Sequence, residues 1–384
     1  MTKRWRTIIF LWLGWYLALM TFQQINWARF TLQRPDDGYA WTGGMTTGSL
    51  DGPKTGGWFY ARWDSYRYIR IAQNGYADPK LATFFPGYPI MMRIADEVLL
   101  SPLMAEDGKS SRMALAGVLV SCVTSLIAAL GMMTLAEDRL GNESDAFRST
   151  FYLLVFPTAM FMVQIYTESA YLAVSLWALV FTYRMQWKWA VPLMIYATLT
   201  RPTGIFLCFP MLTQWLDYWW RGNRLPYWML LAAASPGVTF FLFNAYLGNN
   251  GIDTFKAQQD FGRYLLQPQA VLAFMQQIGW MGVAGNGTVH IGLDIVLTLF
   301  ATGMCLLEWN RHSGLALYGL GATYVSLATG QLVSQNRYVL IVIPIFFVLA
   351  RWGRNPIIDH VWTIISLLLL AMYLIQFTQG FWTG

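Results

Sequence analysis

Long apolar runs with few charges recur along most of this chain, and they constrain its fold more than any other feature. Of its 384 residues, 56% are hydrophobic and only 12% are charged, about half the charged share of an ordinary soluble domain. A soluble globule and a disordered chain are both poor matches to that composition. About 20 apolar residues suffice to cross a bilayer as a helix. We therefore expect an all-α polytopic membrane protein.

The apolar runs predict about eleven transmembrane helices within a single integral-membrane domain, residues 1–384. Several runs between residues 150 and 219 are shorter than a full span, so we expect helices there that are tilted, kinked or only partly embedded. No small-residue cleavage site follows the first run, which favours a retained anchor over a removable signal peptide. The expected helices lie near residues 7–22, 113–135, 150–165, 167–183, 189–200, 204–219, 226–247, 291–308, 314–330, 338–350 and 358–376.

The formal charge of +6, from 26 Lys and Arg against 20 Asp and Glu, does not indicate a nucleic-acid partner, because the cations are scattered between apolar runs. Lys3, Arg4 and Arg6 precede the first run, and the positive-inside rule predicts a cytoplasmic N-terminus. Every second loop is then cytoplasmic, and each short one is basic. These inner loops contain Arg139, Arg148, Arg184, Lys188, Arg221, Arg224, Arg311, Arg351 and Arg354.

Two longer polar segments fall on the outer side of that topology. The first, residues 23–112, is too long for a passive connector and is expected to be functional. The second, residues 248–290, contains Gly, Gln and aromatic residues. Prolines lie within or beside several apolar runs, and a membrane tolerates them where protein or a water-filled cavity satisfies the freed backbone groups. This favours a bundle that encloses a cavity over a simple anchor.

Cysteine and histidine usage indicates neither a metal centre nor a disulfide framework. Cys122, Cys208 and Cys305 each lie inside an apolar run, where they are expected to be small hydrophobic side chains. The three histidines are far apart and match no metal-ligand spacing. The pair Asp36-Asp37 keeps a weak metal alternative open, but we expect no metal and no cofactor.

The densest group of reactive side chains lies in the first outer segment, over residues 58–72. As a helix, this stretch places Asp64 and Tyr68 on one face and Arg67 and Arg70 on the next. A lone carboxylate among aromatic and cationic side chains is placed to accept a proton from a hydroxyl nucleophile. The alternative is an interfacial amphipathic helix in which Asp64 pairs with Arg67 or Arg70.

The turn Asn74-Gly75-Tyr76 is expected to end this helix, and two prolines three residues apart follow it, in Phe84-Phe85-Pro86-Gly87-Tyr88-Pro89. Prolines at that spacing do not continue an ordinary helix. They predict a rigid extended or turned segment whose aromatic side chains suit a substrate cleft. A helix that begins here, with proline in its first turn, is equally compatible with the sequence.

Four charged residues on the outer side stand next to helix breaks or apolar sequence. Glu168, in Tyr166-Thr167-Glu168-Ser169, is a functional candidate if it lies at membrane depth, and part of a helix cap if it lies at the interface. Arg201 and Arg337 stand where the positive-inside rule discourages cations, so we expect them to hold a carboxylate or a phosphate. The helix after Arg337 would add N–H groups for the same anion. Arg263 is a weaker example, and together these arginines are typical of a lipid-phosphate site.

These motifs together resemble the signature of the GPI mannosyltransferase II (PIG-V-like) family, including its bacterial relatives. The resemblance follows the order of the family's motifs over most of the chain. It departs where a Tyr or Arg replaces the His that eukaryotic members often have after the Trp-Asp pair, and the chain is shorter. The motifs are Arg62-Trp63-Asp64-Ser65, Tyr68, Ile71-Ala72, Gly75-Tyr76, Phe84-Phe85-Pro86-Gly87-Tyr88-Pro89, Arg93, Phe156-Pro157-Thr158-Ala159, Tyr166-Thr167-Glu168-Ser169, Thr200-Arg201-Pro202-Thr203-Gly204 and Arg337-Tyr338.

The resemblance implies a GT-C type glycosyltransferase whose active site faces the extracytoplasmic side, at the plasma membrane if the protein is bacterial. It implies an inverting enzyme that moves a sugar, mannose in this family, from a polyprenyl-phosphate donor to a hydroxyl of a glycolipid or glycan acceptor among membrane lipids. By motif match, Asp64 is the expected catalytic base. Arg337, Arg201 and Arg263 are expected to bind the donor phosphate. The expected substrate-binding residues are Arg62, Trp63, Tyr68, Glu168, Tyr88, Gln335 and Asn336.

A membrane transporter or lipid flippase with an outward cavity for an anionic lipid is the main alternative, and a membrane scaffold without chemistry is a further one. Transporters concentrate polar groups at the bilayer midplane near broken helices and often contain inverted repeats. Here the motifs gather at one predicted end of the bundle, beside the long first outer segment, and no inverted repeat is evident. That asymmetry favours an enzyme that acts on one side. A polyprenyl-phosphate glucose or aminosugar donor stays open.

Overall fold

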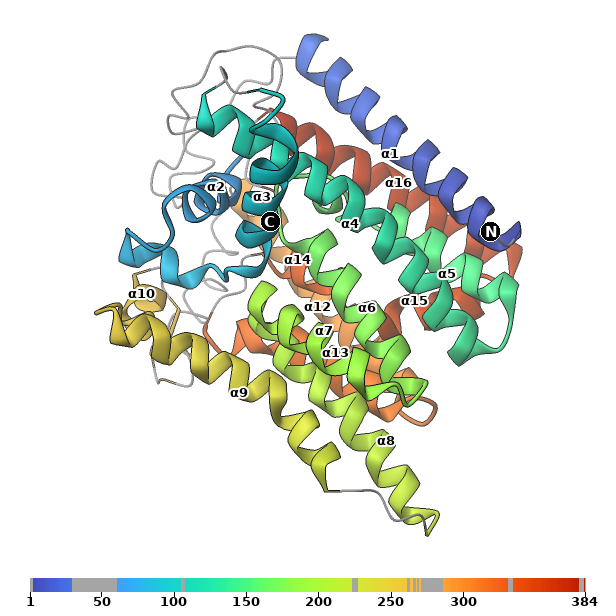
Figure 1. The fold of residues 1–384 in the computed structure, drawn as a ribbon. Helices are drawn as coiled ribbons and strands as arrows, with labels where there is room; N and C mark the ends of the chain where they lie inside the picture. The colour runs from blue at the N-terminus through green and yellow to red at the C-terminus, as the bar shows by residue number, and fades with distance from the viewer. Residues whose placement is uncertain are drawn as a thin grey trace.

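The regular structure of the chain is helical throughout the part that can be described. The computed structural model describes residues 3–29, 61–104, 108–222, 227–260, 263–264, 267, 269–270, 286–330, 334–379 and 383, and within these ranges it contains helices and no strand (Figure 1). The expected all-α architecture is therefore confirmed for these ranges. The pair Asp36-Asp37 lies outside the described residues.

Four of the described helices are both long and apolar enough to cross a membrane, which confirms the expectation of a membrane-embedded protein. Their apolar windows are only partly buried inside the bundle, so much of their apolar surface faces outward. The expected number of eleven spans is not confirmed by this criterion. The four helices are α1 (Lys3–Arg29), α4 (Lys109–Leu140), α9 (Trp228–Asn249) and α16 (Pro356–Thr378).

Seven further helices correspond to the shorter apolar runs. The run 150–165 is not one helix, because the chain breaks at Phe156-Pro157 and continues as the short 3-10 helix η5 (Ala159–Met162). The run 204–219 likewise begins in the 3-10 helix η6 (Pro202–Leu207). The seven are α5 (Glu143–Val155), α6 (Glu168–Tyr183), α7 (Trp187–Thr200), α8 (Cys208–Trp220), α12 (Asn286–Glu308), α13 (Ser313–Leu327) and α15 (Ile343–Trp352).

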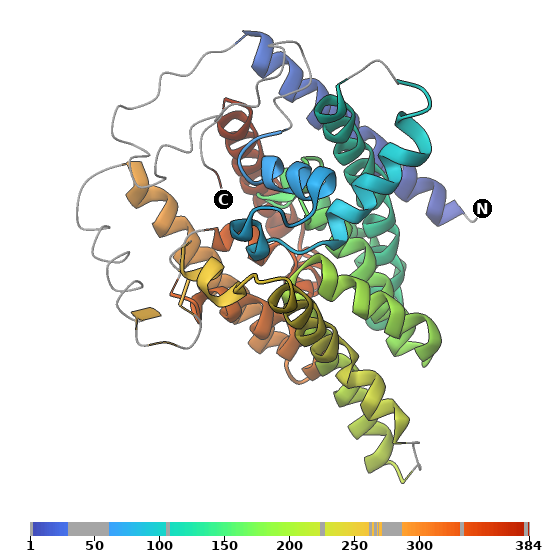
Figure 2. The ribbon, with the colours of Figure 1, turned by 60° about the vertical axis from the view of Figure 1, so that its left-hand side comes forward.

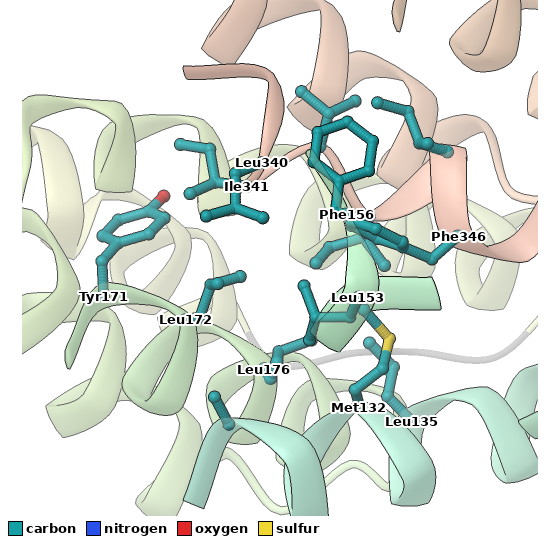
Figure 3. Close-up of a cluster of buried hydrophobic side chains, with 14 of the residues drawn as sticks. Met132, Leu135, Leu153, Phe156, Tyr171, Leu172, Leu176, Leu340, Ile341 and Phe346 are labelled. Carbon is teal, nitrogen blue, oxygen red and sulfur yellow. The ribbon is translucent and has the colours of Figure 1, made fainter. Parts of the chain in front are cut away.

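The centre of the bundle is a large apolar core to which α4, α5, α6 and α15 all contribute. Met132 from α4, Leu153 from α5 and Leu176 from α6 interdigitate there with Phe346 from α15 (Figure 3). α6 is buried along most of its length. Because it is surrounded by other helices, its N-terminus with Glu168 is fixed inside the protein.

A cluster of short helices covers one end of the bundle (Figures 1 and 2). α2 packs on α3 and α4, and α10 packs on η3 and α9. Most of these helices belong to the two expected outer segments, which are folded where the structure describes them. The cluster consists of α2 (Asp64–Asn74), η3 (Pro79–Thr83), α3 (Gly87–Ala95), a π-helical turn (Asp96–Leu100), α10 (Thr254–Gln259) and α14 (Gln335–Val339).

The two-proline segment begins a helix, so the second of the two alternatives for this stretch is confirmed and the extended segment is wrong. Pro86 is the N-cap of α3 and Pro89 lies in its first turn, where missing N–H groups cost little. At Gly87 an added Cβ would lie 2.8 Å from the backbone nitrogen of Thr200. α3 can therefore touch the end of α7 only because this position lacks a side chain.

The opposite end of the bundle is held by a different set of ion pairs. Arg184 and Asp138 join α6 to α4 at 2.7 Å. Glu308, at the end of α12, is fully buried and binds both Arg351 and His312. Arg184 follows α6, His312 precedes α13 and Arg351 lies in the last turn of α15, and all three positions belong to the predicted cytoplasmic loops.

Candidate active site

α2 forms with the face that its sequence pattern predicts. Asp64, Tyr68 and Ile71 are buried together on one side of the helix, as the i, i+4, i+7 spacing requires. Gly75 follows the last helical residue with φ +64°, a conformation that glycine adopts without strain. The helix thus delivers one carboxylate into the interior at its first turn.

The chain approaches Asp64 through an unusual backbone conformation. Trp63, directly before the helix, has φ +54°, which is an outlier for a bulky residue. The hydroxyl of Tyr166 accepts a hydrogen bond from the Asp64 N–H at 3.3 Å and donates one to the Arg62 carbonyl at 3.2 Å. The buried Tyr166 therefore holds both peptide groups of this turn in place.

Both oxygens of the Asp64 carboxylate face arginine side chains. Oδ2 accepts a hydrogen bond from Nη1 of Arg337 at 2.9 Å, and Oδ1 accepts one from Arg67. Burial alone raises the pKa of Asp64, but the positive charges of Arg67 and Arg337 outweigh it, so its pKa lies below the ordinary value. The carboxylate is ionised at neutral pH. The pairing with Arg67 that the interfacial alternative predicts is present, together with a second partner from the far end of the sequence.

Glu168 lies behind Asp64 as the first residue of α6 and is completely buried. Its Oε1 lies 2.9 Å from Nη1 of Arg201 and 3.0 Å from Nε of Arg337. The motif does stand at a helix start, as the helix-cap alternative predicts: Thr167 is the N-cap residue of α6, although its side chain caps no backbone amide among the described residues. Glu168 instead fixes two arginines.

Aromatic faces complete the surroundings of these arginines. The Arg337 guanidinium lies 4.6 Å from the ring centre of Tyr166 and 5.1 Å from that of Phe161. The Arg201 guanidinium lies 5.1 Å from the ring of Tyr338. Such contacts favour a cation that has little access to water. Together they leave few alternative positions for either guanidinium.

We use the name ionic cluster for Asp64, Arg67, Glu168, Arg201 and Arg337. Its members come from α2, α6, the junction of α7 with η6, and α14. Three arginines against two carboxylates leave one positive charge in excess. A buried excess charge is expensive unless an anion completes it. The cluster is therefore suited to an additional anionic ligand.

The ionic cluster opens onto a cavity of about 310 Å³. Asp64, Arg201, Arg337 and Arg263 form its charged wall, and Nη2 of Arg263 lies 3.4 Å from the Tyr338 hydroxyl. The rest of the lining includes apolar side chains, among them Phe85, Phe206, Phe240, Phe255 and Val325, together with polar ones such as Asn244 and Gln258. This combination suits an amphipathic ligand with an anionic group at one end.

Not every predicted site residue reaches this cavity. Tyr68 lines it, whereas Tyr88 is fully buried beside it and donates a hydrogen bond to the Gly117 carbonyl at 2.9 Å. The Arg62 guanidinium stacks over Trp27, and Trp63 packs on the main apolar core. Gln335 and Asn336 are buried in α14, outside the cavity lining formed by described residues.

The expectation that a helix after Arg337 adds N–H groups for an anion stays a prediction, but the structure shows how the segment around Arg337 is held. Arg337 lies inside the short helix α14, and the N–H of Asn336 at its start already donates to Oδ1 of Asp294 at 2.8 Å. Asp294 is a buried acid on α12 that the motif analysis missed. The signal was present, because an acid inside an apolar run is the criterion that singled out Glu168.

A metal site is not apparent among the described residues, where no three His, Cys, Asp or Glu side chains come together. The three cysteines lie within α4, α8 and α12 and are free. Three of the four charged side chains that line the cavity among the described residues are arginines, and a guanidinium binds anions and not cations.

Comparison with known proteins confirms the family resemblance for part of the chain. That part contains α2, α6 and the junction of α7 with η6, which carry four members of the ionic cluster. A family model described as "Mannosyltransferase (PIG-V)" matches residues 56–222. GPI alpha-1,6-mannosyltransferase 2 from Cricetulus griseus is 28% identical over 111 residues, which is 29% of this chain and 22% of that protein. The same enzyme from Rattus norvegicus is 27% identical over 111 residues, with the same coverage. The match thus spans about a fifth of the length of these relatives.

Among solved structures, similarity is found to the oligosaccharyltransferase of Archaeoglobus fulgidus. The apo form aligns with a TM-score of 0.45 and 14% identity, over 96% of this chain and 56% of that one. The complex with an inhibitory peptide and a dolichol-phosphate aligns with a TM-score of 0.40 and 11% identity, over the same shares of the two chains.

Proposed function

We propose that this chain, whose residues 56–222 match the PIG-V mannosyltransferases, is an inverting glycosyltransferase of the GT-C type. It transfers a sugar, mannose, from a polyprenyl-phosphate donor to a hydroxyl of a glycolipid or glycan acceptor. The active site is the cavity beside Asp64, on the extracytoplasmic face of the membrane. The observation that carries the proposal is the Asp64 carboxylate at the wall of a cavity that three arginines also line.

The charge of the site supports a lipid-phosphate donor. The ionic cluster has one positive charge in excess, and Arg263 on the same cavity wall adds a second. A donor phosphodiester carries one negative charge, and the departing polyprenyl phosphate carries up to two at neutral pH. The arginines thus complement the leaving group better than the donor. Stabilisation that grows as charge develops lowers the barrier of the reaction.

The proposed reaction is a single in-line displacement. The acceptor oxygen forms a bond to the anomeric carbon while the bond from that carbon to the phosphate oxygen breaks. The proton of the acceptor hydroxyl moves to the Asp64 carboxylate, and the bonding electrons leave with the polyprenyl phosphate. General base catalysis of this kind is worth about 10²- to 10⁴-fold in rate. A single displacement inverts the anomeric configuration.

Arg337 links the charge of the phosphate to the basicity of Asp64. In the free protein its guanidinium is shared between Asp64 and Glu168, which keeps the pKa of Asp64 low and its carboxylate a weak base. A phosphate that draws hydrogen bonds from Arg337 weakens that restraint. The carboxylate therefore becomes more basic when the donor is bound, which is when a base is needed.

The test is a transfer assay with the purified full chain, radiolabelled polyprenyl-phosphate mannose and a lipid extract. We expect label to move into an acceptor lipid, and Asp64→Asn to lower the rate by about 10²- to 10⁴-fold. Asp78→Asn is the matched control, because Asp78 belongs to the same outer segment but only caps η3. It is expected to keep the wild-type rate. A chelator in the same assay is expected to change nothing.

Three outcomes contradict the proposal in different ways. Transfer by Asp64→Asn at the normal rate, with the variant folded by its thermal unfolding, would exclude Asp64 as the base. Loss of transfer on chelation would require a metal. Movement of the labelled donor across liposome membranes, with no transfer from mannose, glucose or aminosugar donors, would identify a lipid transporter instead.

A further inference from the structure

Asp294 is a buried acid that the proposed chemistry does not use. It lies on α12 with 4% of its surface exposed, and none of the ion pairs formed by described residues includes it. A carboxyl group within an apolar helix is costly to bury. Its carboxylate instead accepts hydrogen bonds from the backbone of Ser334 and Asn336, the latter at 2.8 Å.

Those backbone groups stand at the start of α14, the helix that carries Arg337. The first N–H groups of any helix lack partners within the helix, and α14 has only five residues to stabilise it. A helix that short does not persist on its own hydrogen bonds. Ser334 occupies the N-cap position with φ +76°, and its side chain caps no backbone group among the described residues. Asp294 therefore performs from another helix the task that an N-cap side chain normally performs.

Asn336 is held from two other directions as well. Its carbonyl accepts a hydrogen bond from the Thr158 hydroxyl at 2.9 Å, and its side-chain amide donates to the carbonyl of Thr383 at 2.7 Å. Thr158 belongs to the Phe156-Pro157-Thr158-Ala159 motif, which breaks the expected third span. The next residue along the chain is Arg337, whose guanidinium contacts Asp64 and Glu168. A shift of α14 would move that guanidinium.

We propose that Asp294 is a positioning residue: by capping α14 it sets the Arg337 guanidinium between Asp64 and Glu168. This inference rests on the proposed function for its catalytic consequence, but the cap itself does not. The carboxyl group of Asp294 is needed as an acceptor and not as a charge or a proton carrier. Asparagine retains an acceptor oxygen of the same reach, whereas alanine removes it.

The first measurement follows the cap itself. Hydrogen–deuterium exchange of a peptide that covers residues 334–340 is compared in the full-length wild type, Asp294→Asn and Asp294→Ala. We expect protection to fall about fivefold in Asp294→Ala, the change that corresponds to the loss of one N-cap, and to fall clearly less in Asp294→Asn. Thr298→Ala is the matched control, because Thr298 is buried one turn further along α12 and its hydroxyl donates to the Asp294 carbonyl, not to the carboxyl group that caps α14. It should leave this peptide protected as in the wild type.

The second measurement follows the effect on Arg337 through the transfer reaction. Asp294→Ala is expected to lower kcat by at least tenfold, and Asp294→Asn to restore most of it. In the Arg337→Gln background, Asp294→Ala should have no further effect, because the residue acts only through Arg337. If Asp294 only stabilised the fold, the fold-losses in kcat of Asp294→Ala and Arg337→Gln would multiply in the double variant.

The inference is overturned if Asp294→Ala leaves residues 334–340 as protected as the wild type. It is also overturned if Asp294→Asn is as damaging as Asp294→Ala, because the charge would then matter. Full additivity with Arg337→Gln would refute the positioning role while leaving the cap intact. Absence of transfer by the wild type would refute the proposed function, and the exchange measurement would still decide the cap.

Discussion

Glu168→Gln is the substitution that most directly tests how the site is held together. The side chain is fully buried, and one oxygen contacts Arg201 at 2.9 Å and Arg337 at 3.0 Å. Glutamine has nearly the same shape and keeps an acceptor oxygen but has no charge, so both guanidiniums lose the negative charge that they share. At these distances each pair is worth about 5 kcal/mol in a medium of effective dielectric constant about 20, before desolvation is subtracted. Breaking one partner out of a buried pair typically costs about 3–5 kcal/mol.

Thermal unfolding of the purified protein in detergent measures that loss. A cost of about 3–5 kcal/mol lowers the midpoint by something on the order of 10 °C. Glu308→Gln is the matched control, since Glu308 is as deeply buried and pairs with Arg351 and His312 at the opposite end of the bundle. We expect the two variants to lose similar stability without ligand.

The two variants should differ once a polyprenyl phosphate is added. The site of Glu168→Gln carries one more net positive charge, which an added phosphate can partly neutralise, whereas Glu308→Gln gains no such site. At 100 times the dissociation constant a ligand stabilises a protein by about 2.7 kcal/mol, and the recovery in Glu168→Gln should exceed that in the wild type. An equal response of both variants to the lipid, or a loss below about 1 kcal/mol in Glu168→Gln, would refute the reasoning.

Two further predictions concern the acid limb of the reaction and the packing behind Arg201. Arg67→Leu removes one of the charges that lower the pKa of Asp64, so the acid limb of the pH–rate profile should move to higher pH. In the wild type, the stabilisation from this pair is complete above the unfolded-state pKa of about 3.9, and it is lost only as the pH falls through the lower folded-state pKa. Gly204→Ala places a Cβ 2.5 Å from the Thr198 backbone nitrogen and should lower the free energy of unfolding by about 1–3 kcal/mol. The control Gly303→Ala, whose added Cβ meets no atom of the described residues within 4 Å beyond its own helical backbone, should not destabilise the protein. Equal thermal unfolding midpoints for the two variants would contradict the close contact of Gly204 with Thr198.

The sequence predicts well those parts of the site whose conformation depends on residues close by in the sequence. The helical face of Asp64 and Tyr68 and the stop at Gly75 follow from spacing and from glycine's freedom at positive φ, and the structure confirms both. The motifs also singled out Glu168, Arg201 and Arg337, which the structure brings together. Local sequence patterns identify these three residues because a charged side chain beside a helix break in apolar sequence needs a partner, whichever residue supplies it.

The sequence could not predict which partner each charge takes. Arg201 had a carboxylate and a phosphate as equal candidates, and only the packing of α6 against α7 places Glu168 beside it. The same holds for α14, whose first residues are capped by Asp294 from α12, a helix that is distant in the sequence. Such choices depend on tertiary contacts that no local spacing encodes, which is also why Tyr88 proved to be buried behind the cavity.

The order in which the ribosome makes the ionic cluster has a consequence for its assembly. Asp64 with Arg67, and Glu168 with Arg201, are two electrically neutral pairs that exist once residue 201 has been made. Arg337 follows 136 residues later, roughly 7 to 27 seconds at ordinary rates of synthesis. The nascent chain can therefore bury balanced charges early, and the surplus cation follows only after the helices up to α13 have been made. The ionic cluster thus acquires its excess positive charge only when its last member, Arg337, is made.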